Sequence, residues 1–331
     1  MKPLTGPTDA SKTGLEGLPD IILGAGVFNT QYHDNPESLP ADQVIRRAFE
    51  LGIRAIDTSA YYGPSEEIVG RALKELEKDY PRESYYICTK AGRNGVNQFD
   101  YAASDIRKSV QRSLQRLNTT YLDVLYIHDV EFVDTAGCLE AIGEAFKLKQ
   151  EGVVRFVGIS GYPVSFLAYL ANKVKQTLGP LDIVLTYCNY CLQNTILEKY
   201  LGEFDQAGVS KVLNASPLSM SLLRSQVTHS FHPASEVLKE RVAQAAKLTR
   251  SKGEELADVA SRFVFKHWQG CTVFGLQSVP EVEAAVQDYW MVKDGQWNDQ
   301  LVDEVRNVLG DCIDMVWESG IEHADQNDQN K

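Results

Sequence analysis

The sequence alternates short apolar runs with longer amphipathic stretches, and this alternation repeats eight times along the chain. Most of the apolar runs do not alternate between polar and apolar residues, which is typical of parallel strands that are covered on both faces. Such strands cannot stand alone, because each needs a crossover segment to reach its parallel neighbour. The predicted strands are residues 21–26, 54–57, 85–89, 123–127, 154–159, 182–187, 211–214 and 272–274.

The amphipathic stretches have the helical period. Ile106, Val110, Leu114 and Leu117 follow one another at spacings of four, four and three, which gives one apolar face. Gly52 stands where a glycine commonly ends a helix. The predicted helices are residues 42–51, 65–76, 104–117, 138–151, 164–177, 196–207, 236–251, 254–267 and 279–288.

Eight strand–helix units predict an α/β protein with one closed parallel sheet, a single-domain (β/α)8 TIM barrel. An open doubly wound sheet that binds a dinucleotide through G-x-G-x-x-G is the alternative. Its nearest match, residues 24–29, lacks the third glycine and has no helix directly behind it. We therefore expect the barrel over residues 19–319. The polar ends, residues 1–18 and 320–331, are expected to be flexible segments.

The charge balance limits the partners of the chain. Lys and Arg number 33 against 45 Asp and Glu, a formal charge of −12, so a basic face for nucleic acid or anionic lipid is not expected. No window approaches the ~20 apolar residues of a membrane-spanning helix, and the polar N-terminus lacks the apolar core of a secretory signal. A small-molecule substrate is the expected partner. The oligomeric state is left open.

The six cysteines lie mostly within apolar runs, which is typical of buried, reduced thiols and predicts a cytoplasmic protein. Cys188 and Cys191 form a C-x-x-C pair without a second pair of ligands at suitable spacing. Packing is therefore a better interpretation of this pair than zinc binding, and no metal site is expected.

Reactive side chains follow three neighbouring predicted strands. Asp57, Tyr61 and Tyr62 come after the second strand, Lys90 after the third and His128 after the fourth. In a (β/α)8 barrel the carboxyl ends of the strands build the active site, so these side chains are expected to meet at one rim. Each residue type alone has an ordinary structural explanation, but the whole set is what proton transfer requires.

A phenol has an ordinary pKa of about 10, and a nearby ammonium favours its ionised form. Lys90 could supply that ammonium, Asp57 would keep Lys90 charged, and His128 would orient a substrate oxygen. This set suits a general acid/base in the interconversion of carbonyls and alcohols, with an external hydride carrier.

The motif Asp57-Thr-Ser-x-x-Tyr62-Gly63, the Lys90 that follows an apolar residue and Thr89, and the His128 that ends Tyr-Leu-Asp-Val-Leu-Tyr-Ile-His resemble the catalytic tetrad of the aldo-keto reductases. The resemblance extends over about residues 20–290. It implies Tyr62 as the acid/base, because the family places this tyrosine five residues after the aspartate. Tyr61 is the alternative phenol.

The same resemblance implies a nicotinamide cofactor. Its implied contacts are Gly26, Val27, Phe28, Ser160, Gly161, Ser216, Pro217, Leu218, Met220, Gly275, Gln277, Ser278 and Glu281. Three positions depart from the family pattern: Ala215 replaces a stacking tyrosine, Gly161 replaces an asparagine, and Leu185 replaces a glutamine.

The last predicted strand and the following helix indicate which cofactor is used. Family members that prefer NADP hold its 2′-phosphate with cations in this region, whereas residues 268–292 contain neither Lys nor Arg. Glu281 stands near the position of the family's arginine, and a carboxylate repels a phosphate but accepts from a ribose hydroxyl. We expect NAD, with NADP less favoured.

Residues 128–132, 186–190 and 214–220 resemble the family's sugar dehydrogenases that act on D-arabinose or L-galactose. The implied reaction oxidises the C1 hydroxyl of a free aldose, D-arabinose first, to the aldonolactone. The expected sugar contacts are Arg93, His128, Glu131 and Phe132, with Asn94 and Asn97 on the same rim loop. The alternatives are an L-galactose or L-fucose dehydrogenase, an aldehyde reductase acting on a substrate such as pyridoxal, and an inert barrel with a regulatory role.

Overall fold

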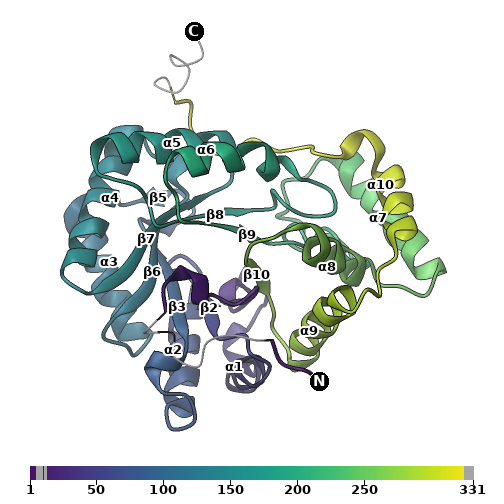
Figure 1. The fold of residues 1–331 in the computed structure, drawn as a ribbon, viewed down its shortest axis with the longest axis horizontal. Coiled ribbons are helices and arrows are strands. Elements are labelled where there is room, and N and C mark those ends of the chain that lie inside the picture. Colours follow the sequence, from purple (N-terminus) through teal and green to yellow (C-terminus); the bar gives the residue numbers. More distant parts are fainter. Residues whose placement is uncertain (5–9, 11–12, 324–331) are drawn as a thin grey trace.

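The computed structural model describes residues 1–4, 10 and 13–323. Eight parallel strands close into a barrel in the order β1-β10-β9-β8-β7-β6-β3-β2 (Figure 1). These strands are β1 Ile21–Gly24, β2 Ala55–Asp57, β3 Tyr86–Ala91, β6 Leu122–His128, β7 Val154–Gly161, β8 Ile183–Tyr187, β9 Lys211–Ala215 and β10 Thr272–Gly275. The predicted single-domain (β/α)8 barrel is confirmed, and every predicted strand is present within a few residues of its expected bounds.

Helices surround the barrel (Figure 1). They are α1 Ala41–Glu50, α2 Ser65–Leu76, α3 Ala103–Arg116, α4 Thr135–Gln150, α5 Val164–Thr177, α6 Leu201–Gln206, α7 Glu236–Ser251, α8 Leu256–His267, α9 Val279–Lys293 and α10 Asp299–Leu309. The predicted helix 196–207 is divided, since residues 196–200 form a 3₁₀ turn before α6. α9 runs to Lys293, beyond its predicted end at Asp288, and the Asp288 carboxylate is paired with Arg262 of α8 at 3.4 Å.

Two elements were not predicted. The loop after β3 forms a small antiparallel hairpin of β4 Arg93–Gly95 and β5 Gln98–Phe99, which places Arg93 opposite Phe99. The second element is α10, which packs against α7 through Leu301, Val305 and other buried apolar residues. Only the hairpin lies beside the rim where the reactive side chains were expected.

The core has two parts. One lies between the sheet and the helices, and the other fills the inside of the barrel with side chains such as Ile22, Tyr86 and Val124. Leu15 and Leu18, which precede β1, belong to this inner cluster. They close the end of the barrel at which the strands begin.

The predicted boundaries at residues 18/19 and 319/320 stay predictions, and residues 5–9, 11–12 and 324–331 lie outside the described residues. Described residues beyond both boundaries contact the barrel unit. The Tyr86 hydroxyl donates to the carbonyl of Gly14 at 2.9 Å. At the other end, the Ile321 amide donates to the carbonyl of Glu131 at 2.9 Å.

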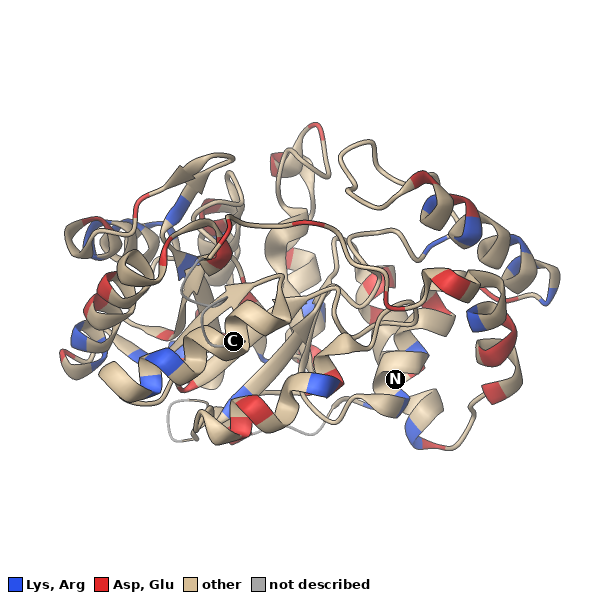
Figure 2. Ribbon diagram, turned by 90° about the horizontal axis from the view of Figure 1, so that it is seen from above, with Lys and Arg blue, Asp and Glu red and all other residues tan. Residues whose placement is uncertain are grey.

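Acidic and basic residues are mixed along the ribbon in the view of Figure 2, and helices on both sides of the molecule carry both kinds. Over the described ranges of the chain, no helix has both the length and the apolar character needed to cross a membrane.

Because residues before β1 close the end of the barrel at which the strands begin, we expect them to contribute measurably to stability. Leu18 is 5% exposed, and replacing a buried leucine by alanine costs about 2–5 kcal/mol of unfolding free energy. Urea unfolding of Leu18→Ala should show a loss in this range. Leu178→Ala is the matched control, because Leu178 is 42% exposed and should change by no more than about 0.5 kcal/mol. Equal stability of the two variants would contradict this role of Leu18.

Candidate active site

A cavity of about 330 Å³ lies at the carboxyl ends of the barrel strands. Every strand of the barrel contributes a residue to its wall. In strand order along the chain these residues are Gly24, Asp57, Lys90, His128, Ser160, Tyr187, Ala215 and Gly275. The cavity is therefore the mouth of the barrel, where this fold places its active sites.

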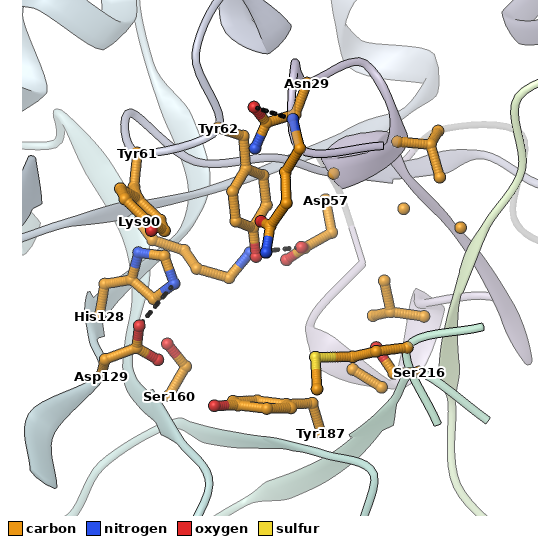
Figure 3. Close-up of a pocket in the computed structure, with 18 of the residues that line it drawn as sticks. Asn29, Asp57, Tyr61, Tyr62, Lys90, His128, Asp129, Ser160, Tyr187 and Ser216 are labelled. Carbon is orange, nitrogen blue, oxygen red and sulfur yellow. Dashed lines mark hydrogen bonds and ion pairs between the residues drawn. The ribbon is translucent and has the colours of Figure 1, made fainter. Parts of the chain in front are cut away.

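The four residues predicted to be catalytic meet in this cavity (Figure 3). The buried Lys90 ammonium is paired with a carboxylate oxygen of Asp57 and donates to the carbonyl of Thr58 at 2.9 Å. The ammonium also lies 4.8 Å from the centre of the Tyr62 ring, and the Tyr62 oxygen is close enough to help raise the Lys90 pKa. The expected contact between a phenol and an ammonium is thus present at the barrel mouth.

The turn after β2 aims Tyr62 at Lys90. The Tyr62 amide donates to the carbonyl of Ser59 at 3.1 Å, and Gly63 follows with a φ of +55° that favours glycine. On the other side of the ring, a Cβ at Gly26 would lie 3.4 Å from the Tyr62 ring. The β1 loop thus packs against this face of the tyrosine, with room for ordinary van der Waals contact.

The electrostatics of Tyr62 differ from the sequence-based expectation. Burial raises the pKa of Tyr62 above its ordinary value, and the lowering effect of Lys90 only partly offsets this. The carboxylates of Asp57 and Asp129 also raise this pKa. Tyr62 is therefore a neutral phenol near pH 7, and the ammonium limits the rise instead of producing a phenolate.

Lys90 keeps its charge. Burial by itself lowers the pKa of the ammonium, but the Asp57 carboxylate and the Tyr62 oxygen outweigh it, so the Lys90 pKa is raised. A buried ammonium without such a partner would lose its proton or destabilise the fold.

His128 is neutral. Burial, together with the positive charges of Lys90 and Arg93, lowers the pKa of its imidazole to about 3, although Asp129 opposes the shift. Nδ1 lies 3.0 Å from Oγ of Ser59, and that Oγ already accepts from the Tyr61 amide. The Ser59 hydroxyl is then free to donate to Nδ1. We therefore assign the proton to Nε2, which can donate into the cavity.

A second cavity, of about 550 Å³, adjoins the first and shares Val27, Ser216, Met220 and Gly275 with it. Of the other predicted cofactor contacts, Gly26 and Ser160 line the first cavity. Those that line the second are Pro217, Leu218, Gln277 and Glu281.

Three predicted cofactor contacts line neither cavity. Phe28 is fully buried in the outer core beneath the β1 loop. Gly161 faces the carboxylate of Glu131, which leaves no room for a Cβ there. Ser278 uses its hydroxyl to cap α9, since its Oγ accepts from the Glu281 amide at 3.4 Å.

The predicted substrate contacts divide in the same way. Arg93 and His128 line the first cavity, whereas Asn94, Asn97, Glu131 and Phe132 line neither. Glu131 is 1% exposed and accepts from the Tyr162 amide and the Ser319 hydroxyl, both at 3.0 Å. The Phe132 ring stacks on Phe99 at 4.9 Å, behind Arg93.

Several cavity residues were missed. Asp129 follows the predicted site residue His128, and Tyr187 is the last residue of a predicted strand. Their positions in the sequence could therefore have indicated that they line the cavity. Tyr32 and Phe231 come from the long connections after β1 and β9. The sequences of these connections show neither a helical nor a strand period, so their path could not be predicted. Arg224, also in the second connection, lines the second cavity and lies 2.9 Å from Nε2 of His229.

A phenol–ammonium pair and a neutral imidazole at the mouth of a (β/α)8 barrel define an oxidoreductase that interconverts carbonyls and alcohols. The chain belongs to the aldo/keto reductase family, whose sequence profile matches residues 20–298. Two curated relatives are similar over nearly their full lengths. The D-arabinose 1-dehydrogenase of Saccharomyces cerevisiae is 44% identical, with 94% of this chain and 96% of that protein covered. The L-galactose dehydrogenase of Arabidopsis thaliana is 36% identical, with 93% and 96% covered.

Solved structures share the fold. An aldo-keto reductase from Bacillus halodurans superimposes with a TM-score of 0.71 at 21% identity, covering 95% of this chain and 98% of the other. A glycerol dehydrogenase from Gluconobacter oxydans gives 0.64 at 22% identity, covering 96% and 98%. At these identities the likeness concerns the fold alone.

Members of this family use nicotinamide cofactors, and the cavity residues fit such a group. The Ser160 hydroxyl is buried on the wall of the first cavity and has no hydrogen-bond partner among the described residues. A buried polar atom in this state is costly, so a polar ligand group there would stabilise it. The same holds for Nε of Arg224 beside the second cavity. Two adjoining cavities also suit an elongated dinucleotide.

The neutral state of His128 can be tested without any substrate. Because the pKa of this imidazole is lowered to about 3, its ring nitrogens should show the neutral pattern in ¹⁵N NMR spectra from pH 5 to 8. Spectra of a His128→Gln variant assign the signal by its loss. A titration midpoint between pH 6 and 7 for this signal would contradict the burial argument.

Proposed function

We propose that this protein oxidises the C1 hydroxyl of a free aldose, D-arabinose first, to the aldonolactone with NAD. The observation that carries the proposal is the 44% identity to a D-arabinose 1-dehydrogenase over 94% of the chain. The complete tetrad in the cavity supports it, because an inert barrel has no need for a buried ammonium beside a phenol. A cytoplasmic location is part of the proposal, since all six cysteines are buried free thiols.

The chain's own residues would handle the oxygen and the proton. His128 would donate from Nε2 to the C1 oxygen and fix its orientation. Tyr62, which is neutral near pH 7, would first release its own proton to solvent and would then take the hydroxyl proton, and the Lys90 ammonium would stabilise the phenolate between these two steps. The bound cofactor supplies the acceptor for the hydride that leaves C1, so the two electrons and both hydrogens of the alcohol are accounted for.

Carbonyl reduction is the second candidate, and one observation favours it. The raised pKa of Tyr62 favours the neutral phenol, which is the form that donates a proton to a carbonyl oxygen. An aldehyde such as pyridoxal would then be the substrate. The 36% identity to an L-galactose dehydrogenase supports L-galactose, and by extension L-fucose, as alternative aldoses. Initial rates over a panel of these compounds, in both directions, distinguish the candidates.

Tyr62→Phe should lower kcat for aldose oxidation at least about 100-fold, because general acid–base catalysis contributes about 10²–10⁴. Tyr61→Phe is the matched control, since Tyr61 lines the same cavity but its ring contacts the Arg93 guanidinium, whereas the ring of Tyr62 faces the Lys90 ammonium. It should stay within about threefold of the parent protein. Steady-state production of NADH measures both. An unchanged rate in Tyr62→Phe would exclude the proposed acid/base.

The preference for NAD is supported by the wall of the second cavity. Glu255, Asp258, Glu281 and Asp288 line it, and Arg224 is the one Lys or Arg among its described residues. Glu281 accepts from the Gln277 amide at 2.7 Å, which holds its carboxylate at the start of α9. A 2′-phosphate would meet the Glu281 carboxylate there.

We expect kcat/KM to be higher with NAD than with NADP, and Glu281→Gln should reduce the difference by roughly tenfold or less, since one charged contact is worth about 1 kcal/mol near a surface. Glu283→Gln is the matched control, because Glu283 is paired with Arg47 at 2.7 Å and does not line the cavity. A higher kcat/KM with NADP would refute the preference.

A further inference from the structure

Asp129 is a carboxylate in the barrel mouth to which the tetrad gives no role. It follows His128 at the end of β6 and has a left-handed backbone, with φ and ψ both 56°. This conformation is uncommon outside glycine, although aspartate tolerates it better than most residues. The turn brings the side chain beside the imidazole, with Oδ2 at 3.6 Å from Nε2 of His128 (Figure 3). Asp129 is 4% exposed and lines the first cavity.

Arg93 holds this carboxylate in place. Its guanidinium pairs with Oδ2 of Asp129 at 2.5 Å and donates to the carbonyls of Gly95 and Val96 in the β4–β5 hairpin. The guanidinium also lies 4.1 Å from the centre of the Tyr61 ring, a cation–π contact. Contacts on several sides leave Arg93 little freedom, so the carboxylate it binds is fixed as well.

One carboxylate oxygen remains open. Among the described residues, no donor reaches Oδ1 of Asp129, while Oδ2 is taken by Arg93. The cavity therefore presents a donor, Nε2–H of His128, and an acceptor, Oδ1 of Asp129, next to each other. Such a pair matches two oxygens on neighbouring carbons, one bound to each group.

We propose that Asp129 is the specificity-determining residue of the site and accepts a hydrogen bond from the hydroxyl next to the reacting carbon, with Arg93 as its positioning residue. The inference rests on the proposed function, since His128 must hold the C1 oxygen for Asp129 to meet the C2 hydroxyl. A substrate without that hydroxyl leaves Oδ1 of this buried carboxylate without a hydrogen bond, and sites built around a hydroxyl reject such analogues strongly.

The test removes the hydroxyl from the substrate and the acceptor from the protein. D-Arabinose and 2-deoxy-D-ribose, which lacks the C2 hydroxyl, are compared by kcat/KM for NAD reduction. A hydrogen bond to a charged group contributes about 1.5–3 kcal/mol, so the parent protein should prefer D-arabinose about 10- to 100-fold. Asp129→Ala should bring the two pentoses within about threefold. Asp129→Asn, which keeps a neutral acceptor, should retain an intermediate preference.

Three controls separate a specific role from a structural one. Reduction of propanal with NADH uses the tetrad without any neighbouring hydroxyl, so its change in Asp129→Asn measures the effect of the lost charge on Tyr62 and His128 alone, and the loss for D-arabinose should exceed it. Asp79→Ala removes an exposed carboxylate that pairs with Arg46 at 2.7 Å, and it should leave all rates unchanged. Thermal unfolding reports whether each variant is folded. If Asp129→Ala is unfolded, the comparison of Asp129→Asn with the parent decides.

The outcomes are distinct. An equal loss for both pentoses and for propanal, or an unchanged preference for D-arabinose in folded variants, would overturn the role of Asp129 and leave the proposed function in place. If the parent protein reduces propanal but oxidises no aldose, the proposed function fails and the inference fails with it.

Discussion

The ion pair between Lys90 and Asp57 is the interaction on which the site depends. An ammonium inside a barrel is costly, and only a carboxylate at contact distance keeps it charged. Parallel pairing of β2 with β3 provides this, because it sets Asp57 against Cys88, two residues before Lys90. The charge state of the whole mouth follows from this pair. The ammonium that Asp57 keeps charged limits the rise of the Tyr62 pKa and helps to keep His128 neutral.

Every strand of the barrel contributes at least one residue to the wall of the first cavity, and residues at the other end of the barrel contribute to its stability. The end of the barrel at which the strands begin is closed by residues before β1, whose side chains belong to the inner core. The opposite end, at the carboxyl ends of the strands, carries polar side chains that the core could not bury without hydrogen-bond partners. Connections after β1, β3 and β9 then add Tyr32, Arg93 and Phe231 to the mouth, so specificity can vary while the strands stay the same.

The strands and the tetrad were predictable because both depend on local patterns. An apolar run covered on two faces is visible in the sequence, and Asp57, Lys90 and His128 each end or follow such a run. Contacts made by irregular loops were not predictable in this way. Arg224 reaches the second cavity from a connection without a period, so the absence of cations from residues 268–292 did not describe that wall fully.

Other differences arise from balances that a sequence does not display. Lys90 was expected to lower the pKa of the tyrosine, but the cost of burying a phenolate is larger than this effect. Glu131 was expected to contact the sugar because residues 128–132 resemble the sugar dehydrogenases and were expected to lie on a rim loop. The 3₁₀ turn Val130–Phe132 instead directs it away from both cavities, toward Tyr162.

That buried Glu131 ties the last described stretch of the chain to the wall of the active site. Its side chain accepts from Tyr162, two residues after Ser160, and from Ser319, while its main-chain carbonyl accepts from Ile321. Burial raises the pKa of this carboxyl to about 8, so near neutral pH it is mostly an uncharged acid and not a buried anion. Residues 319–321 therefore hold the end of β7 in place through Glu131, and a chain cut before Ser319 would loosen the strand end that carries Ser160.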